Sequence, residues 1–275
     1  MPELPEVETM VRDLSRRVVG RRIVEVEASF PGIVRYPEFP EFVQRVVGRT
    51  IEAVSRRGKY AILSLFSGDS LIIHRGMSGS LLGRAPSDPE DRFVRLLIRL
   101  DDGSELRYDD PRKFGKIFVM EGTGSERPLP WTNMGPEPLS DDFTVDGFGE
   151  ALSKRTALIK PLLLGQQIVA GLGNIYVDEA LHLAGIHPER RANTLSPDEV
   201  RRLYAAIREV LAMAVERRGT TFSSYRDLEG RSGQYQDALQ VFRKAGTACP
   251  RCGTGIIRLV VGGRGTHICP ACQKV

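Results

Sequence analysis

The chain has 275 residues, of which 41% are hydrophobic and 27% charged, a composition that excludes a disordered protein and is typical of a globular one. Its length suffices for one large or two ordinary domains. The formal net charge of +4 is too small to predict a nucleic-acid partner by itself. No apolar run approaches the roughly 20 residues of a membrane span, and the acidic start MPELPEVE lacks the layout of a signal peptide. We therefore expect a cytoplasmic protein with no membrane partner.

The first segment of the chain predicts an amphipathic helix. Its apolar residues recur three or four positions apart, at Leu4, Val7, Val11, Leu14 and Val18. From about Ile23 to Met120 the pattern changes to short runs rich in Val and Ile, separated by turn signals such as SGDS and DDGS. Antiparallel pairing in a sandwich or barrel is the expected arrangement.

The second half of the chain predicts helices. Residues 121–140 contain four prolines and three glycines, which is typical of an interdomain linker. Helical segments follow around 145–155, in TALIKPLLLGQ, in IYVDEALHLAG and from Pro197 to Arg217. Ser196 and Glu199 have the spacing of a capping box at the start of the last helix. The final 45 residues return to short β-prone pieces.

All four cysteines of the chain lie in two CxxC pairs. Cys249 and Cys252 are followed, after sixteen residues, by Cys269 and Cys272. This spacing fits a tetrahedral Zn²⁺ site of the zinc-ribbon or finger kind, and a site with four thiolates is structural. Disulfides or a redox dithiol are the alternatives, and a cytosolic chain disfavours disulfides. His267 is close enough in sequence to compete as a ligand, although a satisfied or exposed side chain is the simpler interpretation.

The basic residues gather near this cysteine module. Residues 231–275 carry seven basic side chains and one acid, so they have a net charge of +6, and the remainder of the chain sums to −2. Such a segment suggests contact with a polyanion, although an ordinary solvated surface has the same composition. Between the cysteine pairs, IIRLVVGGRGTHI predicts a β-hairpin with Gly262 and Gly263 at its tip and Arg264 projecting outward.

A glycine-containing turn lies between two of the predicted helices. In QIVAGLGN, Gly171 and Gly173 permit the tight approach of a helix-turn-helix connection. Asn174 can cap the following helix, whose free N–H groups suit a phosphate. A simple interhelical turn explains the same residues, and Lys160 together with the basic module favours DNA-backbone binding.

The N-terminus carries a candidate nucleophile. Methionine before proline is a usual substrate for methionine removal, which exposes the secondary amine of Pro2. An α-amino group titrates at about 7.7–8.0, so a useful fraction is neutral at pH 7 and can form a Schiff base. Glu3 and Glu6 are spaced to flank this amine as proton donor and acceptor. The same residues also suit the start of an ordinary helix.

Together these features resemble the formamidopyrimidine-DNA glycosylase family from end to end. The resemblance is carried by segments in the family's order: PELPEVE at the start, RRGKY at 56–60, HRGMSG at 74–79, DPRKFG at 110–115, GLGNIYVDEAL at 171–181 and GRGTHICPAC at the end. It implies an α+β protein with an N-terminal β-sandwich flanked by helices (residues 1–130), a linker (131–140), a helix–two-turn–helix DNA-binding domain (141–234) and a four-cysteine zinc finger (235–275). One structural Zn²⁺ and a monomeric state are also implied.

The resemblance implies a base-excision-repair glycosylase that removes oxidised purines from duplex DNA and cleaves abasic sites by β,δ-elimination. Pro2 attacks C1′ of a nucleotide flipped from the duplex. Glu3 acts as general acid/base, and Glu6 supports the N-terminus. Lys59 lies near the lesion's sugar-phosphate, and Arg264 completes the catalytic set while it also grips the bent DNA backbone.

Further matched positions are implied to bind DNA. Three of them fill the space that the lesion vacates, with Phe114 wedged between base pairs and Arg112 bonded to the estranged cytosine. The remaining ones contact the backbone. The DNA-binding set is His74, Met77, Arg112, Phe114, Lys160 and Asn174. Taken as an isolated pair, Met77 and Phe114 also suit core packing.

The chain departs from the family pattern at three places. Arg75 stands where an apolar residue is common, Gly165 where an acid is usual, and Phe242 where a tyrosine often contacts phosphate. Residues 219–236 are rich in Gly, Ser and polar side chains, so we expect a flexible loop that closes over the flipped base. Its detailed base contacts do not carry over.

Three alternative functions remain at this point. An endonuclease VIII-like enzyme shares the nucleophile but prefers oxidised pyrimidines, and the set of Met77, Arg112 and Phe114 argues for the purine branch. A non-catalytic damage-binding protein would have lost Pro2 or Glu3, and both are present. A zinc-ribbon protein of transcription leaves the N-terminal motif unexplained.

Overall fold

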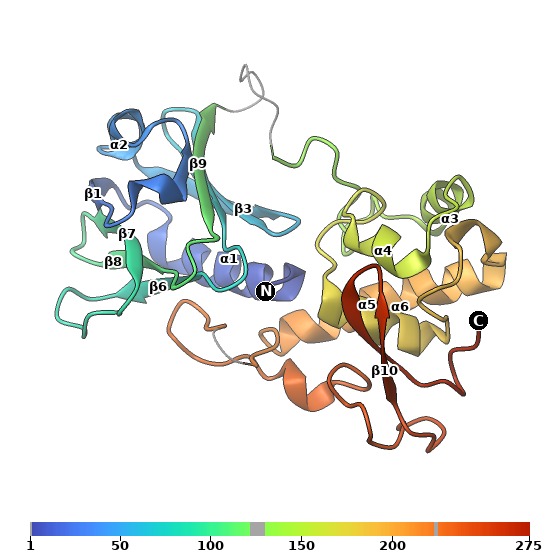
Figure 1. Cartoon of the computed structure of the whole chain (residues 1–275). Helices are drawn as coiled ribbons and strands as arrows, with labels where there is room; N and C mark the ends of the chain where they lie inside the picture. Colours follow the sequence, from blue (N-terminus) through green and yellow to red (C-terminus); the bar gives the residue numbers. More distant parts are fainter. Residues whose placement is uncertain (1, 122–129, 223–224) are drawn as a thin grey trace. The chain divides into compact units, whose positions relative to one another are not determined.

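A computed structural model of the chain describes residues 2–121, 130–222 and 225–275 (Figure 1). The chain forms two compact units: unit 1 comprises Met1–Thr132 and Arg217–Gln236, and unit 2 comprises Asn133–Glu216 and Asp237–Val275. A segment from the second half of the sequence therefore belongs to the first unit. The mixture of helices and sheets confirms the expected α+β class, while the four expected domain bounds stay a prediction. Within the described residues, no helix is both long and apolar enough to cross a membrane.

Unit 1 consists of two sheets and their flanking helices. The four-stranded sheet has the order β1-β7-β8-β6, and the five-stranded sheet has the order β2-β9-β5-β4-β3. Their strands are β1 (Ile23–Glu27), β2 (Val34–Tyr36), β3 (Ile51–Arg57), β4 (Tyr60–Leu65), β5 (Asp69–His74), β6 (Ser80–Arg84), β7 (Val94–Leu100), β8 (Glu105–Asp109) and β9 (Lys116–Glu121). Neighbouring strands pair antiparallel as predicted, except that β2 runs parallel to β9.

The core of unit 1 lies between the sheets and the first helix. The expected helix forms as α1 (Leu4–Val18), which packs against β3 and β4 (Figure 1). Leu14 and Val18 on its apolar face are fully buried in one cluster with residues of both sheets. Alternation along β4 places every second side chain in this core. Burial of these apolar faces is the main force that holds the unit together.

One helix of unit 1 is missing from the sequence prediction. The helix α2 (Phe39–Val46) interrupts the stretch that we expected to be β-structure. Pro40 fits its first turn, where the missing N–H costs nothing, and Phe42 and Val46 are buried one turn apart. A helix of eight residues shows too few turns for its periodicity to stand out from neighbouring strands.

Unit 2 is helical and ends in a β-hairpin. Its elements are α3 (Val145–Ser153), α4 (Ile159–Leu164), α5 (Asn174–Ala184), α6 (Pro197–Glu216), β10 (Ile257–Val261) and β11 (Arg264–Ile268). The capping box before α6 is confirmed: the Ser196 N–H donates to Glu199 Oε2 at 2.8 Å, and the Glu199 N–H donates to Ser196 Oγ at 3.3 Å. The hairpin is confirmed as well, with Gly262 and Gly263 at its tip in the left-handed region.

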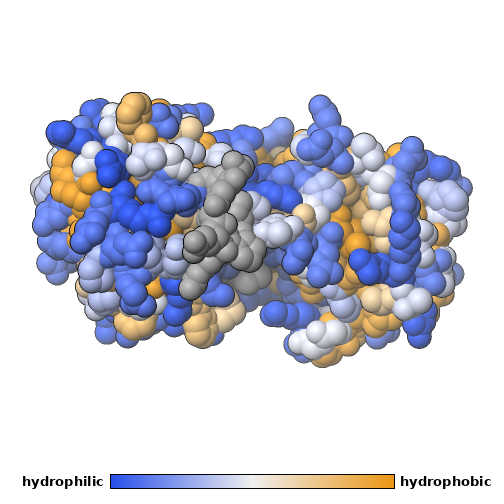
Figure 2. Space-filling model, turned by 90° about the horizontal axis from the view of Figure 1, so that it is seen from above, coloured by the Kyte–Doolittle hydropathy of each residue, from blue (hydrophilic) through white to orange (hydrophobic). Residues whose placement is uncertain are grey.

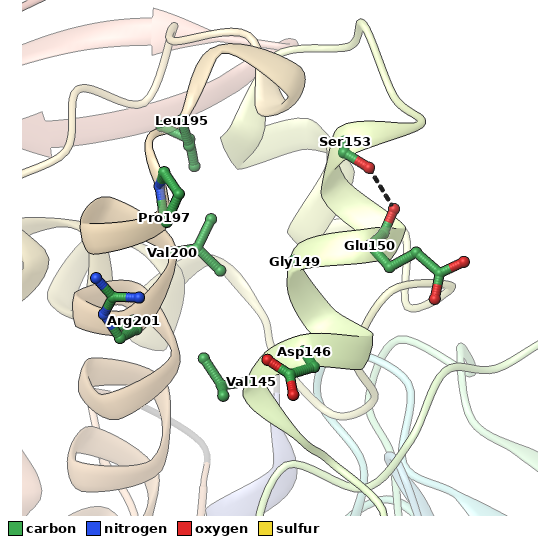
Figure 3. Close-up of a pocket in the computed structure, with 9 residues that line it drawn as sticks. All are labelled: Val145, Asp146, Gly149, Glu150, Ser153, Leu195, Pro197, Val200 and Arg201. Atoms are coloured by element: carbon green, nitrogen blue, oxygen red, sulfur yellow. Dashed lines mark hydrogen bonds between the residues drawn. The ribbon is translucent and has the colours of Figure 1, made fainter.

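Figure 2 shows that hydrophilic residues cover most of the face drawn for each unit, with smaller hydrophobic areas between them. A shallow groove of unit 2 runs between α3 and the start of α6 (Figure 3). Val145 and Val200 face each other across it, and the Glu150 side chain points away from it. None of the site residues predicted from the sequence lines this groove.

Candidate functional site

The first turn of α1 gathers buried acidic groups in unit 1. Pro2 is buried, and Glu3 and Glu6 are only 2% and 1% exposed. The Glu6 carboxylate accepts the Glu3 N–H at Oε2 and the Thr220 N–H at Oε1, each at 2.7 Å. A Cβ on Gly219 would lie 2.7 Å from Glu6 Oε1, so a glycine is needed for this approach. The structure therefore brings Pro2, Glu3 and Glu6 together in one buried cluster.

Lys59 lies in the turn between β3 and β4, and its side chain is almost fully buried. Arg56 ties this turn to α1, because it donates to Glu8 Oε2 at 2.9 Å and to the Gly58 carbonyl at 3.0 Å. Burial alone would raise the pKa of Glu8, but the hydrogen bonds from Arg56 and Arg12 outweigh it and hold that pKa below its ordinary value. The ion pair of Arg56 with Glu8 therefore fixes the position of Lys59 relative to the first helix.

His74 ends β5 as a neutral side chain. Its Nδ1 accepts the Gly76 N–H at 3.1 Å, and its ring packs on Tyr60 with 4.7 Å between centroids. Burial, helped by the positive charges of Lys59 and Lys116, lowers the pKa of His74 from 6.5 to about 4. At neutral pH a phosphate would meet an imidazole N–H donor here and no additional positive charge.

Met77 and Phe114 lie on neighbouring loops of unit 1, with exposed fractions of 36% and 45%. A Cβ on Gly76 would meet the Phe114 carbonyl at 2.5 Å, so the backbones of the two loops are in direct contact. The guanidinium of Arg112 lies over the Phe114 ring, 4.6 Å from its centroid. This exposure excludes core packing as the role of the pair and leaves two apolar side chains available for insertion.

Asp110 holds the two loops together. It is fully buried, and its carboxylate accepts the Ser78 hydroxyl at 2.6 Å, the Gly115 N–H at 2.9 Å and the Arg112 N–H at 3.2 Å. It therefore joins the turn that carries Met77 to the loop that carries Phe114. Asp110 lies within DPRKFG and was not predicted as a site residue; the acid that opens a turn motif was the available signal.

The described residues of 217–236 are held on unit 1 by ion pairs. Arg218 bridges two carboxylates, one of Asp13 on α1 and one of Asp227, whose Oδ2 lies 2.6 Å from Nη2. Asp227 is 1% exposed and also accepts the Arg231 N–H at 2.8 Å. Burial would raise the pKa of Asp227, but bonds from Arg218 and Arg231 hold it below its usual value. Ser223 and Ser224 of the expected loop lie outside the described residues.

In unit 2 the four cysteines form one cluster. Their sulfur atoms all lie within 4.8 Å of one another, close enough for a single ion, and four thiolates are a donor set that Zn²⁺ prefers in structural sites. The four residues are Cys249, Cys252, Cys269 and Cys272. His267 is outside this cluster: it is buried, its N–H donates to Asp178 Oδ2 at 2.9 Å, and its ring packs on Phe242.

Three side chains of α5 hold the segment that carries the four cysteines, here called the zinc module, against the helical part of unit 2. Asp178 accepts the His267 N–H, and Glu179 accepts the N–H groups of Val241 and Phe242 at 3.0 and 2.8 Å. His182, one turn further on, places Nε2 3.4 Å from the Cys249 sulfur. Burial raises the pKa of Glu179 although the backbone bonds act in the opposite direction. The helix α5 therefore supports the zinc module.

The predicted backbone-binding residues of unit 2 occupy different environments. Arg264 is exposed beside the hairpin tip, as expected. Lys160 is fully buried, and its ammonium donates to Asp178 Oδ1 at 2.6 Å and to the Thr266 hydroxyl at 2.8 Å. This geometry does not present Lys160 to a phosphate, because its donors already serve buried acceptors within the unit.

The expected capping role of Asn174 is wrong. Gly173 is the N-cap residue of α5, and Asn174 is the first residue inside the helix. The Asn174 side chain donates to the Gly265 carbonyl at 2.9 Å, while its Oδ1 is buried with no hydrogen-bond partner within the described residues. Gly171 is left-handed at φ +82°, as the tight turn requires. Asn174 therefore joins the turn before α5 to the zinc hairpin.

The two units define an α+β protein in which a β-sandwich carries a buried acidic N-terminal turn and a helical unit carries a four-cysteine zinc finger. Three family models match it in this order: the formamidopyrimidine-DNA glycosylase N-terminal domain over residues 1–117, the H2TH domain of the same glycosylase over 134–226, and the zinc finger found in FPG and IleRS over 246–275. The chain belongs to the formamidopyrimidine-DNA glycosylase family, and its cysteine cluster is the family's zinc finger.

Individual relatives agree with this assignment. The formamidopyrimidine-DNA glycosylase of Symbiobacterium thermophilum is 50% identical over 275 residues, which cover 100% of this chain and 90% of that protein. The one from Herpetosiphon aurantiacus is 45% identical and covers 99% and 100% of the two chains. The Lactococcus lactis Fpg in complex with DNA containing an abasic site is 40% identical and superposes with a TM-score of 0.92 over 99% of this chain and 100% of that chain.

Proposed function

We propose that the protein is a base-excision-repair glycosylase that removes oxidised purines from duplex DNA and cleaves the resulting abasic site. The observation that carries the proposal is the buried cluster at the start of α1, where Glu6 fixes the Glu3 backbone beside Pro2. The family assignment supports the same conclusion, since the solved structures include Lactococcus lactis Fpg with abasic-site DNA and a mutant of that protein with Fapy-dG DNA.

The proposed chemistry begins at the Pro2 amine after Met1 has been removed. The amine nitrogen forms a bond to C1′ of the damaged nucleotide, and the glycosidic bond breaks with its electron pair going to the base. Glu3 supplies and accepts protons at the sugar ring while the ring opens to an iminium ion. Loss of a C2′ proton then expels the 3′ phosphate, and a second elimination expels the 5′ phosphate. Hydrolysis of the imine frees Pro2.

The exposed loops of unit 1 are proposed to fill the gap that the damaged nucleotide leaves. Phe114 and Met77 are exposed apolar side chains on loops in contact, which suits insertion between base pairs. Arg112, stacked on Phe114, can donate to the estranged base. Lys59 and His74 are proposed to contact the phosphates that flank the lesion. In unit 2, Asn174 and Arg264 are proposed to contact the DNA backbone.

Borohydride trapping tests the proposal directly. Reduction of the iminium ion should leave a covalent complex of Met1-processed protein with DNA that contains 8-oxoguanine opposite cytosine. Glu3→Gln should bind this duplex and lose base excision. A protein that retains Met1 serves as the control, because its Pro2 nitrogen is an amide, and it should give no trapped complex.

The same duplexes distinguish the alternatives. A panel of oxidised purines and pyrimidines, with analysis of the strand ends, identifies the substrate class and the elimination products. Preference for oxidised pyrimidines would favour an endonuclease VIII-like enzyme. Binding without any trapped complex in verified Met1-processed protein would overturn the lyase proposal in favour of a damage-binding protein.

A further inference from the structure

Arg75 is a fully buried arginine in the turn between β5 and β6, two residues before Met77. It is 2% exposed, and the acceptors of its hydrogen bonds are neutral oxygens. Its Nε donates to the Gly79 carbonyl at 2.8 Å, and its Nη2 donates to Ser80 Oγ at 3.3 Å and to the Arg226 carbonyl at 3.2 Å. Its Nη1 has no hydrogen-bond partner among the residues that the structure describes.

Burial of such a guanidinium costs free energy. A charge loses most of its hydration free energy in a protein interior, and the attraction of the Glu6 and Asp227 carboxylates offsets this only in part for Arg75. The unpartnered N–H adds to the cost. A leucine would fill the same turn without either penalty. Arg75 therefore has a role other than filling space. The hydrogen bond that reaches farthest along the sequence indicates what this role is.

That contact lies 151 positions along the chain, at Arg226. The guanidinium carbon also lies over the ring of Tyr225, 5.0 Å from its centroid. Tyr225 in turn donates from its hydroxyl to the Arg218 carbonyl at 3.1 Å, and its own carbonyl accepts the Thr221 hydroxyl at 3.1 Å. Arg75 therefore holds the centre of the 217–236 segment against the turn that carries Met77.

We propose that Arg75 is a positioning residue for base excision: it fixes the backbone of Tyr225 and Arg226 relative to Met77 and so shapes the surface that meets the extruded base. This inference rests on the proposed function. A planar guanidinium can stack on Tyr225 and bridge the Gly79 and Arg226 carbonyls at once, which a lysine ammonium cannot do. Because an abasic site has no base to hold, Arg75 should matter for excision and much less for strand cleavage.

The test compares two substrates with one variant. Arg75→Leu should lower kcat/KM for excision from an 8-oxoguanine duplex by about tenfold or more, the size expected from the loss of one or two hydrogen bonds. Cleavage of a preformed abasic site by the same variant should change by less than about threefold. Arg75→Lys, which keeps the charge, should fall between wild type and Arg75→Leu in excision, and it replaces the leucine variant if that one does not fold.

Arg107→Leu is the matched control, because Arg107 is similarly buried in unit 1 but pairs with Glu105 on the sheet. It should leave the ratio of excision to cleavage at the wild-type value. Equal loss of both activities in Arg75→Leu would overturn the positioning role and leave a merely structural one. Wild-type protein inactive on both substrates would instead refute the proposed function.

Hydrogen exchange of the free protein tests the anchoring by Arg75 independently of the proposed function. Amides around Tyr225 to Leu228 should exchange faster in Arg75→Leu than in wild type, while those of α1 should not. Unchanged exchange in this segment would refute the anchoring by Arg75, whatever the protein does to DNA.

Discussion

The Glu6 carboxylate and the Thr220 N–H form a 2.7 Å hydrogen bond between residues 214 positions apart in the chain. The second oxygen of Glu6 accepts the Glu3 N–H at the same distance. One buried side chain thus positions both the first turn of α1, where the proposed nucleophile lies, and the segment that is proposed to meet the damaged base. Movement of the segment is therefore coupled to the geometry of the N-terminus.

Glu6→Gln should break this coupling. The amide retains one acceptor oxygen but turns an N–H group toward a backbone donor, so one of the two bonds is lost. The free energy of unfolding should fall by about 1.5–3 kcal/mol, the usual contribution of a hydrogen bond to a charged group, as urea titration would measure. The yield of borohydride-trapped complex should fall as well. Wild-type stability together with wild-type trapping would show that Glu6 positions neither element.

Asp110→Ala should release the two loops that carry Met77 and Phe114. The buried Ser78 hydroxyl and Gly115 N–H would both lose their acceptor, and each unsatisfied group costs about 1–3 kcal/mol. We expect weaker binding of lesion duplex, measured by fluorescence anisotropy, along with a lower melting temperature. Asp109→Ala is the neighbouring control, since Asp109 accepts the Phe93 N–H instead. Equal effects of the two variants on DNA binding would contradict this role for Asp110.

His74 should make the protein sensitive to acid. Burial lowers the pKa of His74 to about 4, whereas the unfolded chain binds the same proton at about 6.5. The unfolded state therefore binds more protons between pH 6.5 and 4, and stability is lost as pH falls through this range, by roughly 3 kcal/mol at most from this group.

His74→Asn should flatten that part of the stability curve. The Asn Oδ1 can still accept the Gly76 N–H that His74 Nδ1 accepts, but it does not titrate. Urea titrations at a series of pH values between 4 and 7.5 would measure the slope. Identical slopes for the variant and wild type would mean that other groups cause the acid sensitivity.

Local patterns predicted much of the fold, and long-range contacts account for most of what they missed. The periodicity of Leu4 to Val18 and the capping box at Ser196 both depend on neighbours within one helical turn, and both predictions were confirmed. The place of residues 217–236 in unit 1 depends on Arg218 reaching Asp13, 205 positions away. No spacing rule within a sequence reports such a pair.

The same contrast between local patterns and long-range contacts applies to the candidate site. The cysteine cluster was predictable because metal ligands have characteristic spacings. The sequence did not reveal that Asp110, Asp178 and Arg75 each connect several parts of the structure. Their hydrogen-bond partners come from different elements, which no local pattern identifies. Lys160 shows the same limit: its basic character predicts a phosphate contact, and only tertiary packing shows that its ammonium pairs with Asp178 in the interior.

Removal of the zinc should disorder the hairpin and weaken DNA binding. The four thiolates would repel one another or take up protons, and the hydrophobic cluster that includes two of the cysteines is small: its buried members are Val241, Cys249, Ile256 and Cys269. Chelation followed by metal analysis should show loss of affinity for lesion duplex in step with loss of zinc. Affinity that survives verified metal loss would refute the contribution of this module to binding.

Lys160→Met decides between a structural and a phosphate-binding role for this lysine. The ion pair of Lys160 with Asp178 is fully buried, and removal of one partner of a buried pair typically destabilises a protein by about 3–5 kcal/mol because the other charge is left uncompensated. Lys154→Met is the control, since Lys154 pairs with Glu150 at the surface and its replacement should leave the free energy of unfolding close to the wild-type value. In the double variant Lys160→Met/Asp178→Asn, the uncompensated charge is gone, so the loss should be smaller than the sum of the two single losses. If Lys160→Met instead keeps wild-type stability and loses only affinity for DNA, the lysine leaves Asp178 to contact phosphate, and the buried pair is not its functional state.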